Sequence, residues 1–240
     1  MDILFQGSVA KYLDRPEDNE DAYDVAAERG RIVVSDGASE SYDGKSWAGL
    51  LTKAFAEAPP AEEALATCVE AFTALHDPAS MGWSKAAAYE RGSFATALIV
   101  QEDLAEQAVA IQCVGDSCAV LTDGKDLLNV LPYQKASEFE GKPTLLSTLP
   151  RHNTHLFASG MFSVPEVVWS YKDARPLFLL CMTDALGAWL LRSHEEADGG
   201  LALERLLEVR SEADLSTLVE LERAEGRMRR DDSTLVIALL

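Results

Sequence analysis

The 240-residue sequence has few of the residue patterns that mark disulfide-rich or zinc-binding proteins. Its four cysteines are scattered and form no CxxC pair, so neither a disulfide framework nor a zinc knuckle is predicted. The four histidines show no HExxH pattern. Each cysteine lies among apolar residues, and we expect all of them to be small core residues: Cys68, Cys113, Cys118 and Cys181.

Basic residues are also scarce. The chain has 21 Lys and Arg against 40 Asp and Glu, which gives a formal net charge of -19 at pH 7. Such a chain repels nucleic acid and anionic membranes, so we expect neither as a partner. Three explanations of the acidic surface remain open: it attracts basic substrates, it binds cations, or it only confers solubility.

Long apolar runs are absent as well. No run is long enough for a membrane-spanning helix, and no basic region followed by an apolar stretch marks a signal peptide. We therefore expect a cytoplasmic protein. The composition is ordinary for a globular protein, with 48% hydrophobic and 25% charged residues, and we expect a single domain over residues 1–240.

The order of the hydrophobic patterns predicts an α+β fold. Strands are expected at 2–9, 22–25 and 31–35, and helices at 45–57 and from about 60 to 76. Further strands are expected at 94–100, 108–114, 118–121, 126–131, 164–171, 177–183 and 233–240. Helices are expected at 185–193, 196–209 and 211–227. Because strands and helices do not alternate as βαβα units, we expect a sandwich of mainly antiparallel sheets with helices outside.

Two parts of this outline carry more specific predictions. Apolar residues of the second helix, from Leu65 to Leu75, recur at helical spacing and are expected to be core. Residues 132–160 contain proline, serine and histidine with weak periodicity, and we expect a long loop or a mobile flap there.

Acidic residues recur where the predicted strands begin or end. Asp36 follows the apolar run Ile32–Val34, and a lone Asp-Gly after a strand is more often a simple turn than a ligand site. The same arrangement occurs at five places: Glu20-Asp21, Asp36, Asp116, Asp184 and Asp231-Asp232. Carboxylates that converge repel one another unless cations or protons neutralise them, so a converged cluster implies cations.

The candidate ligands are all oxygen donors, which favours Mg or Mn over zinc or copper. Two such ions about 4 Å apart can bind a phosphoryl oxygen and activate a bridging water for in-line attack.

The local sequences of the acidic segments resemble those of the metal-dependent protein phosphatases, the type-2C serine/threonine phosphatases. Six segments match in the family's order: Asn19-Glu20-Asp21, Val34-Ser35-Asp36-Gly37, Gly92-Ser93-Phe94-Ala95-Thr96, Val114-Gly115-Asp116-Ser117, Thr183-Asp184-Ala185-Leu186 and Arg230-Asp231-Asp232-Ser233-Thr234. Each segment alone is a weak signal, but together they span residues 19–234, nearly the whole chain.

The resemblance implies an αββα sandwich, in four layers, with a two-metal site at one end. Asp36 would bridge two Mn or Mg ions, Asp184 and Asp231 would hold the first, and Glu20 and the Gly37 carbonyl would hold the second. Asp116 would support, with Asp184, a weaker third ion. The water between the first two ions would hydrolyse phosphoserine or phosphothreonine of a protein substrate, with Asp36, Asp184 and Asp231 as the catalytic carboxylates. A cognate Ser/Thr kinase would be the partner enzyme.

Four departures from the family's pattern bear on activity. The arginine that binds phosphate in the family usually lies four residues before the glutamate, whereas Arg15 lies five before Glu20. The resemblance therefore implies that Arg15, after a one-residue insertion, or Lys11 as a substitute would take this role. Ala38 stands where some members have a histidine, which leaves protonation of the leaving group to water. Ala185 replaces a glycine and is expected to strain a turn with positive φ. Asp232 replaces an asparagine and adds negative charge.

None of these departures removes a proposed metal ligand, so we expect an active enzyme. Two alternatives stay open. The chain could be a regulatory or binding module that keeps the phosphatase fold without catalysis, or a phosphatase of small phosphate esters. The oligomeric state is left open.

Overall fold

Two five-stranded antiparallel sheets lie face to face in the computed structural model, which describes residues 1–158, 161–172, 176–196 and 199–240. The first sheet has the order β1-β14-β13-β7-β8, with β1 at Asp2–Val9, β14 at Ser233–Leu239, β13 at Phe178–Met182, β7 at Cys118–Thr122 and β8 at Leu127–Leu131. The second has the order β12-β6-β5-β3-β2, with β12 at Val167–Ser170, β6 at Ala108–Val114, β5 at Ala97–Asp103, β3 at Arg31–Asp36 and β2 at Asp21–Ala26.

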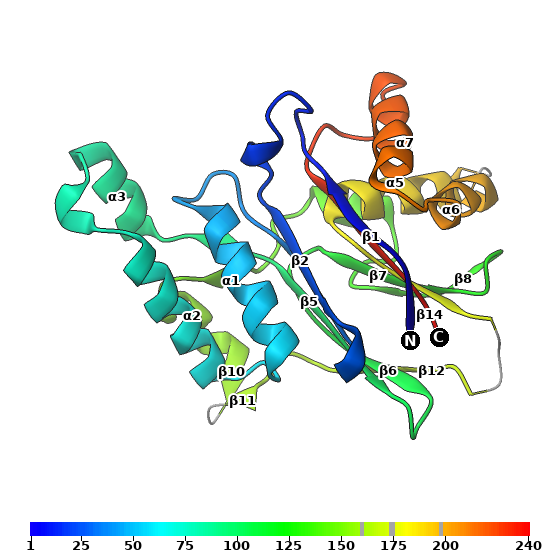
Figure 1. Ribbon diagram of the computed structural model, residues 1–240, viewed down its shortest axis with the longest axis horizontal. Coiled ribbons are helices and arrows are strands. Elements are labelled where there is room, and N and C mark those ends of the chain that lie inside the picture. Colours follow the sequence, from blue (N-terminus) through cyan, green and yellow to red (C-terminus); the bar gives the residue numbers. More distant parts are fainter. Residues whose placement is uncertain (159–160, 173–175, 197–198) are drawn as a thin grey trace.

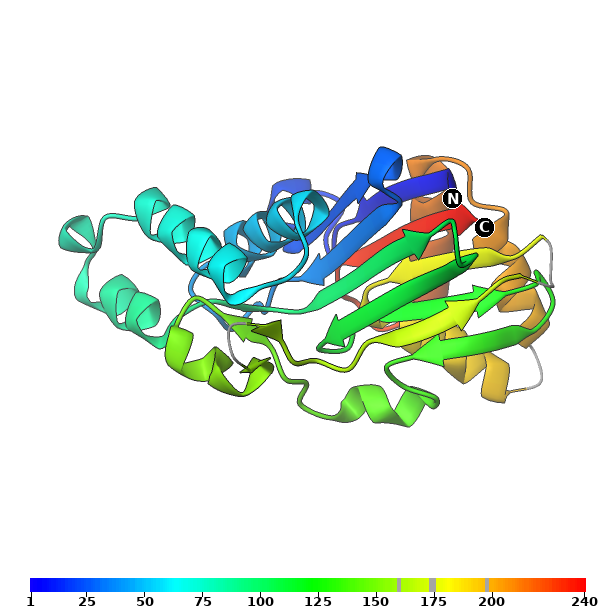
Figure 2. The ribbon, with the colours of Figure 1, turned by 90° about the horizontal axis from the view of Figure 1, so that it is seen from below.

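Helices cover the outer face of each sheet (Figures 1 and 2). The second sheet is covered by α1 (Gly44–Glu57) and α2 (Glu62–Leu75). The first is covered by α5 (Asp184–Glu195), α6 (Gly199–Leu207) and α7 (Glu212–Ala224). The result is the expected four-layer αββα sandwich. None of the described helices is long and apolar enough to cross a membrane.

The strands alternate between two hydrophobic cores. In β14, Leu235 and Ile237 face the helices α5–α7, whereas Val236 and Ala238 face the second sheet. Successive side chains of a strand point to opposite faces, and here both faces are buried. This explains why the central strands are continuous apolar runs and are easily recognised in the sequence.

The ends of strands from both sheets meet at one end of the sandwich. In the second sheet Asp21, which begins β2, pairs with Asp36, which ends β3. In the first sheet Met182 ends β13 beside the beginnings of β14 and β7. The chain crosses from the second sheet to the first between β6 and β7, at the same end. Acidic residues at these strand ends are therefore brought together.

Most predicted elements are confirmed, with several corrections. The predicted strand 94–100 is split at Thr96 into β4 (Phe94–Ala95) and β5. The predicted strand 164–171 is reduced to β12. Helix α3 (Trp83–Arg91) was not predicted because it buries no residue and leaves Trp83 86% exposed. Leu75 was expected in the core and is 61% exposed.

The segment 132–160, where we expected a long loop or a mobile flap, contains several short regular elements. It contains the 3-10 helices η4 (Ala136–Glu140) and η5 (Thr154–Leu156), the strands β9 (Leu146–Ser147) and β10 (Phe157–Ala158), and α4 (Pro150–Asn153). Its β9 pairs with β4, and the Trp47 indole donates to the Leu146 carbonyl at 2.9 Å. Residues 159–160 lie outside the described residues, as do 173–175, between the predicted strands 164–171 and 177–183, and 197–198 of the predicted helix 196–209.

The remaining short elements complete the chain. They are the 3-10 helices η1 (Pro16–Asp18), η2 (Ala27–Arg29) and η3 (Pro78–Ser80), and the strand β11 (Met161–Phe162), which pairs with β10.

Candidate functional site

Asp36 is held rigidly at the end of β3. It lies two residues after Val34, which faces the space between the sheets, so its side chain is on the same face. Its backbone N–H donates to Thr96 Oγ1 at 2.8 Å, and the Thr96 N–H donates back to the Asp36 carbonyl at 2.9 Å. The Thr96 hydroxyl also contacts Ser117 Oγ at 2.6 Å. These bonds fix the direction in which the carboxylate points.

Gly37 lies where three segments approach closely. A Cβ at this position would lie 2.5 Å from the carbonyl carbon of Gly44 and 2.8 Å from the carbonyl oxygen of Glu20. The Gly37 N–H donates to that Glu20 carbonyl at 3.2 Å. Only glycine fits here, and the close approach joins Asp36 to the loop that carries Glu20.

Five of the six predicted metal ligands line one cavity of about 470 Å³. These are Asp36, Gly37, Asp116, Asp184 and Asp231. Residues of the 132–160 segment form part of the wall, namely Phe139, Gly141, Pro143 and Leu145. The structure therefore brings together carboxylates from β3, the β6–β7 turn, the start of α5 and the loop before β14, and places the 132–160 segment beside them.

The carboxylates of this cluster are electrostatically strained. Burial, followed by the charges of Asp21 and Asp184, raises the pKa of Asp36 well above its usual range. Burial raises the pKa of Asp184 to about 6. Burial likewise raises the pKa of Asp116 and of Glu20. Like-charged groups that are buried together favour protons or cations, and this cluster would take up either.

Asp21 belongs to the same cluster, although the sequence analysis gave it no role. Its Oδ2 accepts hydrogen bonds from the hydroxyls of Thr183 at 2.9 Å and Thr234 at 2.8 Å. Its Oδ1 is buried and has no hydrogen-bond partner among the described residues. The strand period gave a usable signal, because Tyr23 and Val25 face the space between the sheets and Asp21 continues their face.

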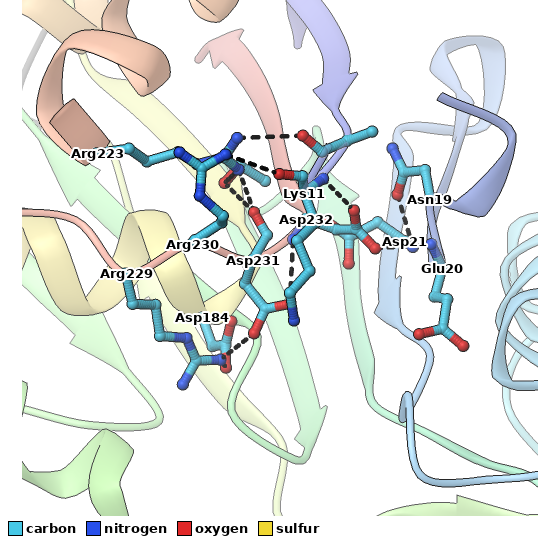
Figure 3. A network of polar contacts seen from close by, with 12 residues as sticks. Lys11, Asn19, Glu20, Asp21, Asp184, Arg223, Arg229, Arg230, Asp231 and Asp232 are labelled. Carbon is cyan, nitrogen blue, oxygen red and sulfur yellow. Dashed lines mark hydrogen bonds and ion pairs between the residues drawn. The ribbon is translucent and has the colours of Figure 1, made fainter. Parts of the chain in front are cut away.

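Asp232 ties the N-terminal loop to the start of β14. Its carboxylate accepts the backbone N–H groups of Lys11 at 2.6 Å and Glu20 at 2.8 Å (Figure 3). The negative charge that the sequence analysis expected here is therefore used to hold the segment that carries Glu20.

Glu20 and Arg15 lie apart from the other predicted residues. They line a neighbouring cavity of about 250 Å³, and Figure 3 shows Glu20 on the far side of the network from Arg229. The Arg15 guanidinium lies 4.5 Å from the ring centre of Tyr12 and forms an ion pair with Asp18 at 3.4 Å. The sixth predicted metal ligand and the predicted phosphate-binding arginine thus share one groove.

The expected strain at Ala185 is not found. Ala185 is the second residue of α5. Among the described residues other than glycine, Gln107 alone has a positive φ, so Ala185 does not. Since a helical residue has negative φ, alanine suits this position as well as glycine does.

Arg229 enters the carboxylate cluster, which the sequence analysis did not predict. Its Nη2 donates to Asp184 Oδ2 and lies 3.2 Å from Asp231 Oδ2 (Figure 3). Two arginines precede Asp231 in the sequence, and nothing in the pattern indicates which of them points inward. Among the described residues that line the larger cavity, Arg229 is the basic one.

The carboxylate and carbonyl oxygens of the cavity are the donor type that a divalent cation such as Mg or Mn prefers, but in this structure they are not arranged to coordinate one. All of them are oxygens, and Asp184 Oδ1 is buried without a hydrogen-bond partner in the described part of the chain. Within that part, no group of three or more His, Cys, Asp or Glu residues is placed to hold a metal ion. The Arg229 guanidinium instead takes two of the carboxylates.

Comparison with known proteins gives a consistent picture of the fold. No family model and no curated protein matches the sequence. Among solved structures, PppA, "a key regulatory component of T6SS in Pseudomonas aeruginosa", is 18% identical with a TM-score of 0.56, over 98% of this chain and 97% of that one. Stp1, a serine/threonine phosphatase from Staphylococcus aureus, is 16% identical with a TM-score of 0.56, over 100% and 97%.

A third similar structure is the Mycobacterium tuberculosis serine/threonine phosphatase PstP/Ppp. It is 17% identical with a TM-score of 0.57, and the match covers 99% of each chain. The likeness therefore extends over the whole architecture rather than over one motif. The chain has the fold of the serine/threonine protein phosphatases that its sequence resembles.

Proposed function

We propose that the protein is a Mn- or Mg-dependent phosphatase that hydrolyses phosphoserine and phosphothreonine in another protein. The observation that supports this most is the single cavity lined by Asp36, Gly37, Asp116, Asp184 and Asp231. Four separate chain segments contribute these oxygens, and their burial has a stability cost that a purely structural cluster would not need.

Each residue has a proposed part in this site. Asp36 would lie between two ions, Asp184 and Asp231 would hold the first ion, and Glu20 and the Gly37 carbonyl would hold the second. Asp116 would support a third ion with Asp184. The bound ions would supply an activated water and shield the charge of a phosphoryl group.

The chain's own residues would prepare the substrate. Arg15 or Lys11 would bind the phosphoryl oxygens from the smaller groove, which opens beside Glu20. No proton donor stands at Ala38, so the leaving serine or threonine would be protonated by water. The substrate is proposed to be a phosphoprotein with a cognate Ser/Thr kinase.

The experiment measures Mn²⁺-dependent hydrolysis of p-nitrophenyl phosphate and of phosphoserine and phosphothreonine peptides. We expect activity that EDTA abolishes and that falls about a thousandfold or more in Asp36→Asn and Asp184→Asn, because both remove proposed ligands. Asp24→Asn is the matched control, since Asp24 lies on β2 with Asp21 and takes no part in the cavity. Unchanged activity in the two Asn variants would refute the mechanism.

A second function, a binding or regulatory module, is favoured by one observation. Arg229 pairs with two of the proposed ligands, Asp184 and Asp231. Calorimetry would show no Mn²⁺ binding in such a module, and no phosphopeptide would be hydrolysed. Faster hydrolysis of small phosphate esters than of phosphopeptides would instead indicate a small-molecule phosphatase.

A further inference from the structure

We propose that Arg229 is a positioning residue that stands in for a cation between Asp184 and Asp231, must leave before a divalent ion binds there, and thereby sets the cation affinity of the site. The guanidinium contacts one oxygen of each carboxylate. The inference rests on the proposed function, because it assumes that these carboxylates are meant for cations.

The ion pair joins a movable side chain to fixed ones. The side chain of Arg229 is 47% exposed, whereas that of Asp184 is 6% exposed. Asp184 is the first residue of α5 and cannot follow the arginine outward without unwinding the helix. A long, half-exposed arginine can return to water at low cost, so the arginine is the partner that leaves.

The position of Asp231 does not depend on Arg229. The buried Arg223 of α7 donates to the backbone carbonyls of Asp231 and, at 3.1 Å, of Ala10. It also donates to Ser233 Oγ at 3.3 Å. Arg223 therefore holds the backbone of the loop, while Arg229 holds only the carboxylate groups, and removing Arg229 leaves the loop in place.

Arg229 and a divalent ion compete for the same oxygens. The guanidinium already places one positive charge against the two carboxylates, and a doubly charged ion between them would repel the adjacent arginine strongly in this buried setting. The observed association constant for the ion is then the intrinsic constant multiplied by the fraction of molecules in which the arginine has left the carboxylates. A charge-assisted contact of this kind, partly screened by water, corresponds to about a tenfold reduction.

The neighbouring basic residues do not share this role. Arg230 is exposed and donates at 3.4 Å to the backbone carbonyl of Lys11, away from the carboxylates. Lys11 Nζ lies 3.5 Å from Asp231 Oδ1 and does not contact Asp184 among the interactions of the described residues. Arg230 therefore provides a control that removes the same charge one residue away.

The test is isothermal titration of Mn²⁺ into the full chain, compared for the wild type, Arg229→Gln and Arg230→Gln. We expect the Kd of Arg229→Gln to be about tenfold lower than that of the wild type, and the Kd of Arg230→Gln to stay within about twofold. The metal-free melting temperature of Arg229→Gln should fall, because two carboxylates lose their partner. Its rise on adding Mn²⁺ should exceed that of the wild type.

One nitrogen of Arg229, Nη2, contacts both carboxylates. Arg229→Lys keeps the charge but replaces the guanidinium with a shorter and more strongly hydrated ammonium group, so we expect an intermediate Kd. It also serves if Arg229→Gln does not fold. Equal Kd values for the wild type and both Arg229 variants, an equal gain in Arg230→Gln, or no Mn²⁺ binding by any of them would overturn the inference.

Failure of the inference and failure of the proposed function give different results. If the wild type binds Mn²⁺ and Arg229→Gln binds it more tightly, but no phosphate ester is hydrolysed, the function is wrong and the competition stands. If hydrolysis depends on Mn²⁺ while the Kd values are equal, the function stands and the competition is wrong.

Discussion

Two buried acidic sites of the same molecule are in opposite electrostatic states. Glu222 of α7 has a side chain that is 1% exposed, and it accepts hydrogen bonds from the Trp189 indole at 2.9 Å and from Arg227 at 2.6 and 2.9 Å. Arg205 also donates to it. The hydrogen bond from Arg227, together with those from Arg205 and Trp189, outweighs the effect of burial and lowers the pKa of Glu222 to about 2. In the Asp36 cluster, burial and like charges raise the pKa of Asp36 instead, and burial raises the pKa of Asp184 although the charge of Arg229 opposes it.

The difference separates a structural acid from a group of acids that the fold leaves short of partners. Glu222 joins α5, α6 and α7, and its charge is compensated by two arginines. The Asp36 cluster contains two buried carboxylate oxygens without hydrogen-bond partners among the described residues, on Asp21 and Asp184. The fold gives the buried carboxylate of Glu222 a full set of hydrogen bonds, but it leaves carboxylate oxygens of the Asp36 cluster without them. Unpaired oxygens of this kind are what a ligand site requires.

The largest expected effect is a difference in the sign of stability changes. Glu222→Gln should lower the free energy of unfolding by about 3 kcal/mol, because it leaves the two arginines without their carboxylate. Asp36→Asn should raise the free energy of unfolding of the metal-free protein by about 1 kcal/mol, because it removes a repelling buried charge. Urea denaturation in EDTA measures both.

Asp24→Asn is the control for these two variants, and its stability should change by no more than about 0.5 kcal/mol. A loss of stability in Asp36→Asn as large as that in Glu222→Gln would contradict the comparison.

The next effect is on the pH dependence of stability. The pKa of Asp184 is higher in the folded protein, about 6, than in the unfolded chain, so the folded state holds more protons between these values. Metal-free stability should therefore fall as pH rises from about 4 to 6, by roughly 2–3 kcal/mol from this group. Glu222, with its lowered pKa, should contribute the opposite slope, with stability lost as pH falls from about 4.5 towards 2.

Thermal denaturation across this range, with and without Mn²⁺, is the measurement. Excess Mn²⁺ should reverse the slope between pH 4 and 6, because a bound cation favours ionised carboxylates. A metal-free protein whose stability rose steadily from pH 4 to 6 would contradict the assignment of raised pKa values to the Asp36 cluster.

The smallest effect concerns the groove beside the cluster. Arg15→Ala should raise KM for a phosphopeptide about fivefold and change kcat little, because Arg15 is half exposed and would bind the phosphoryl group before and during reaction alike. Arg91→Ala, on the surface of α3, is the matched control. If Lys11→Ala changed KM and Arg15→Ala did not, the phosphate-binding role would pass to Lys11.

How far the sequence predicts this molecule depends on burial. Strands such as β3 and β14 are apolar on both faces, and their positions could be read from the sequence to within a residue or two. Helix α3 has no apolar stripe and could not be recognised. The short elements between 132 and 160 are held by contacts with distant residues, such as Trp47, and have no period of their own.

The candidate site shows the same division. The acidic residues at strand ends could be predicted because an acid after an apolar run is conspicuous. The inward turn of Arg229 could not, because the direction of a long side chain in a loop is decided by charges that are distant in sequence, here Asp184. Asp21 was within reach, since its strand period points it between the sheets.

The two hydrogen bonds that the Asp232 carboxylate accepts have a consequence for how the protein folds. The carboxylate joins β14 to Glu20 across 212 positions of the chain, and β14 lies between β1 and β13 in its sheet. Such distant contacts form late, because the entropy of closing a long loop must be overcome first. The cavity is therefore completed only when β14 has inserted between β1 and β13, and a folding intermediate without this strand lacks a complete site for cations.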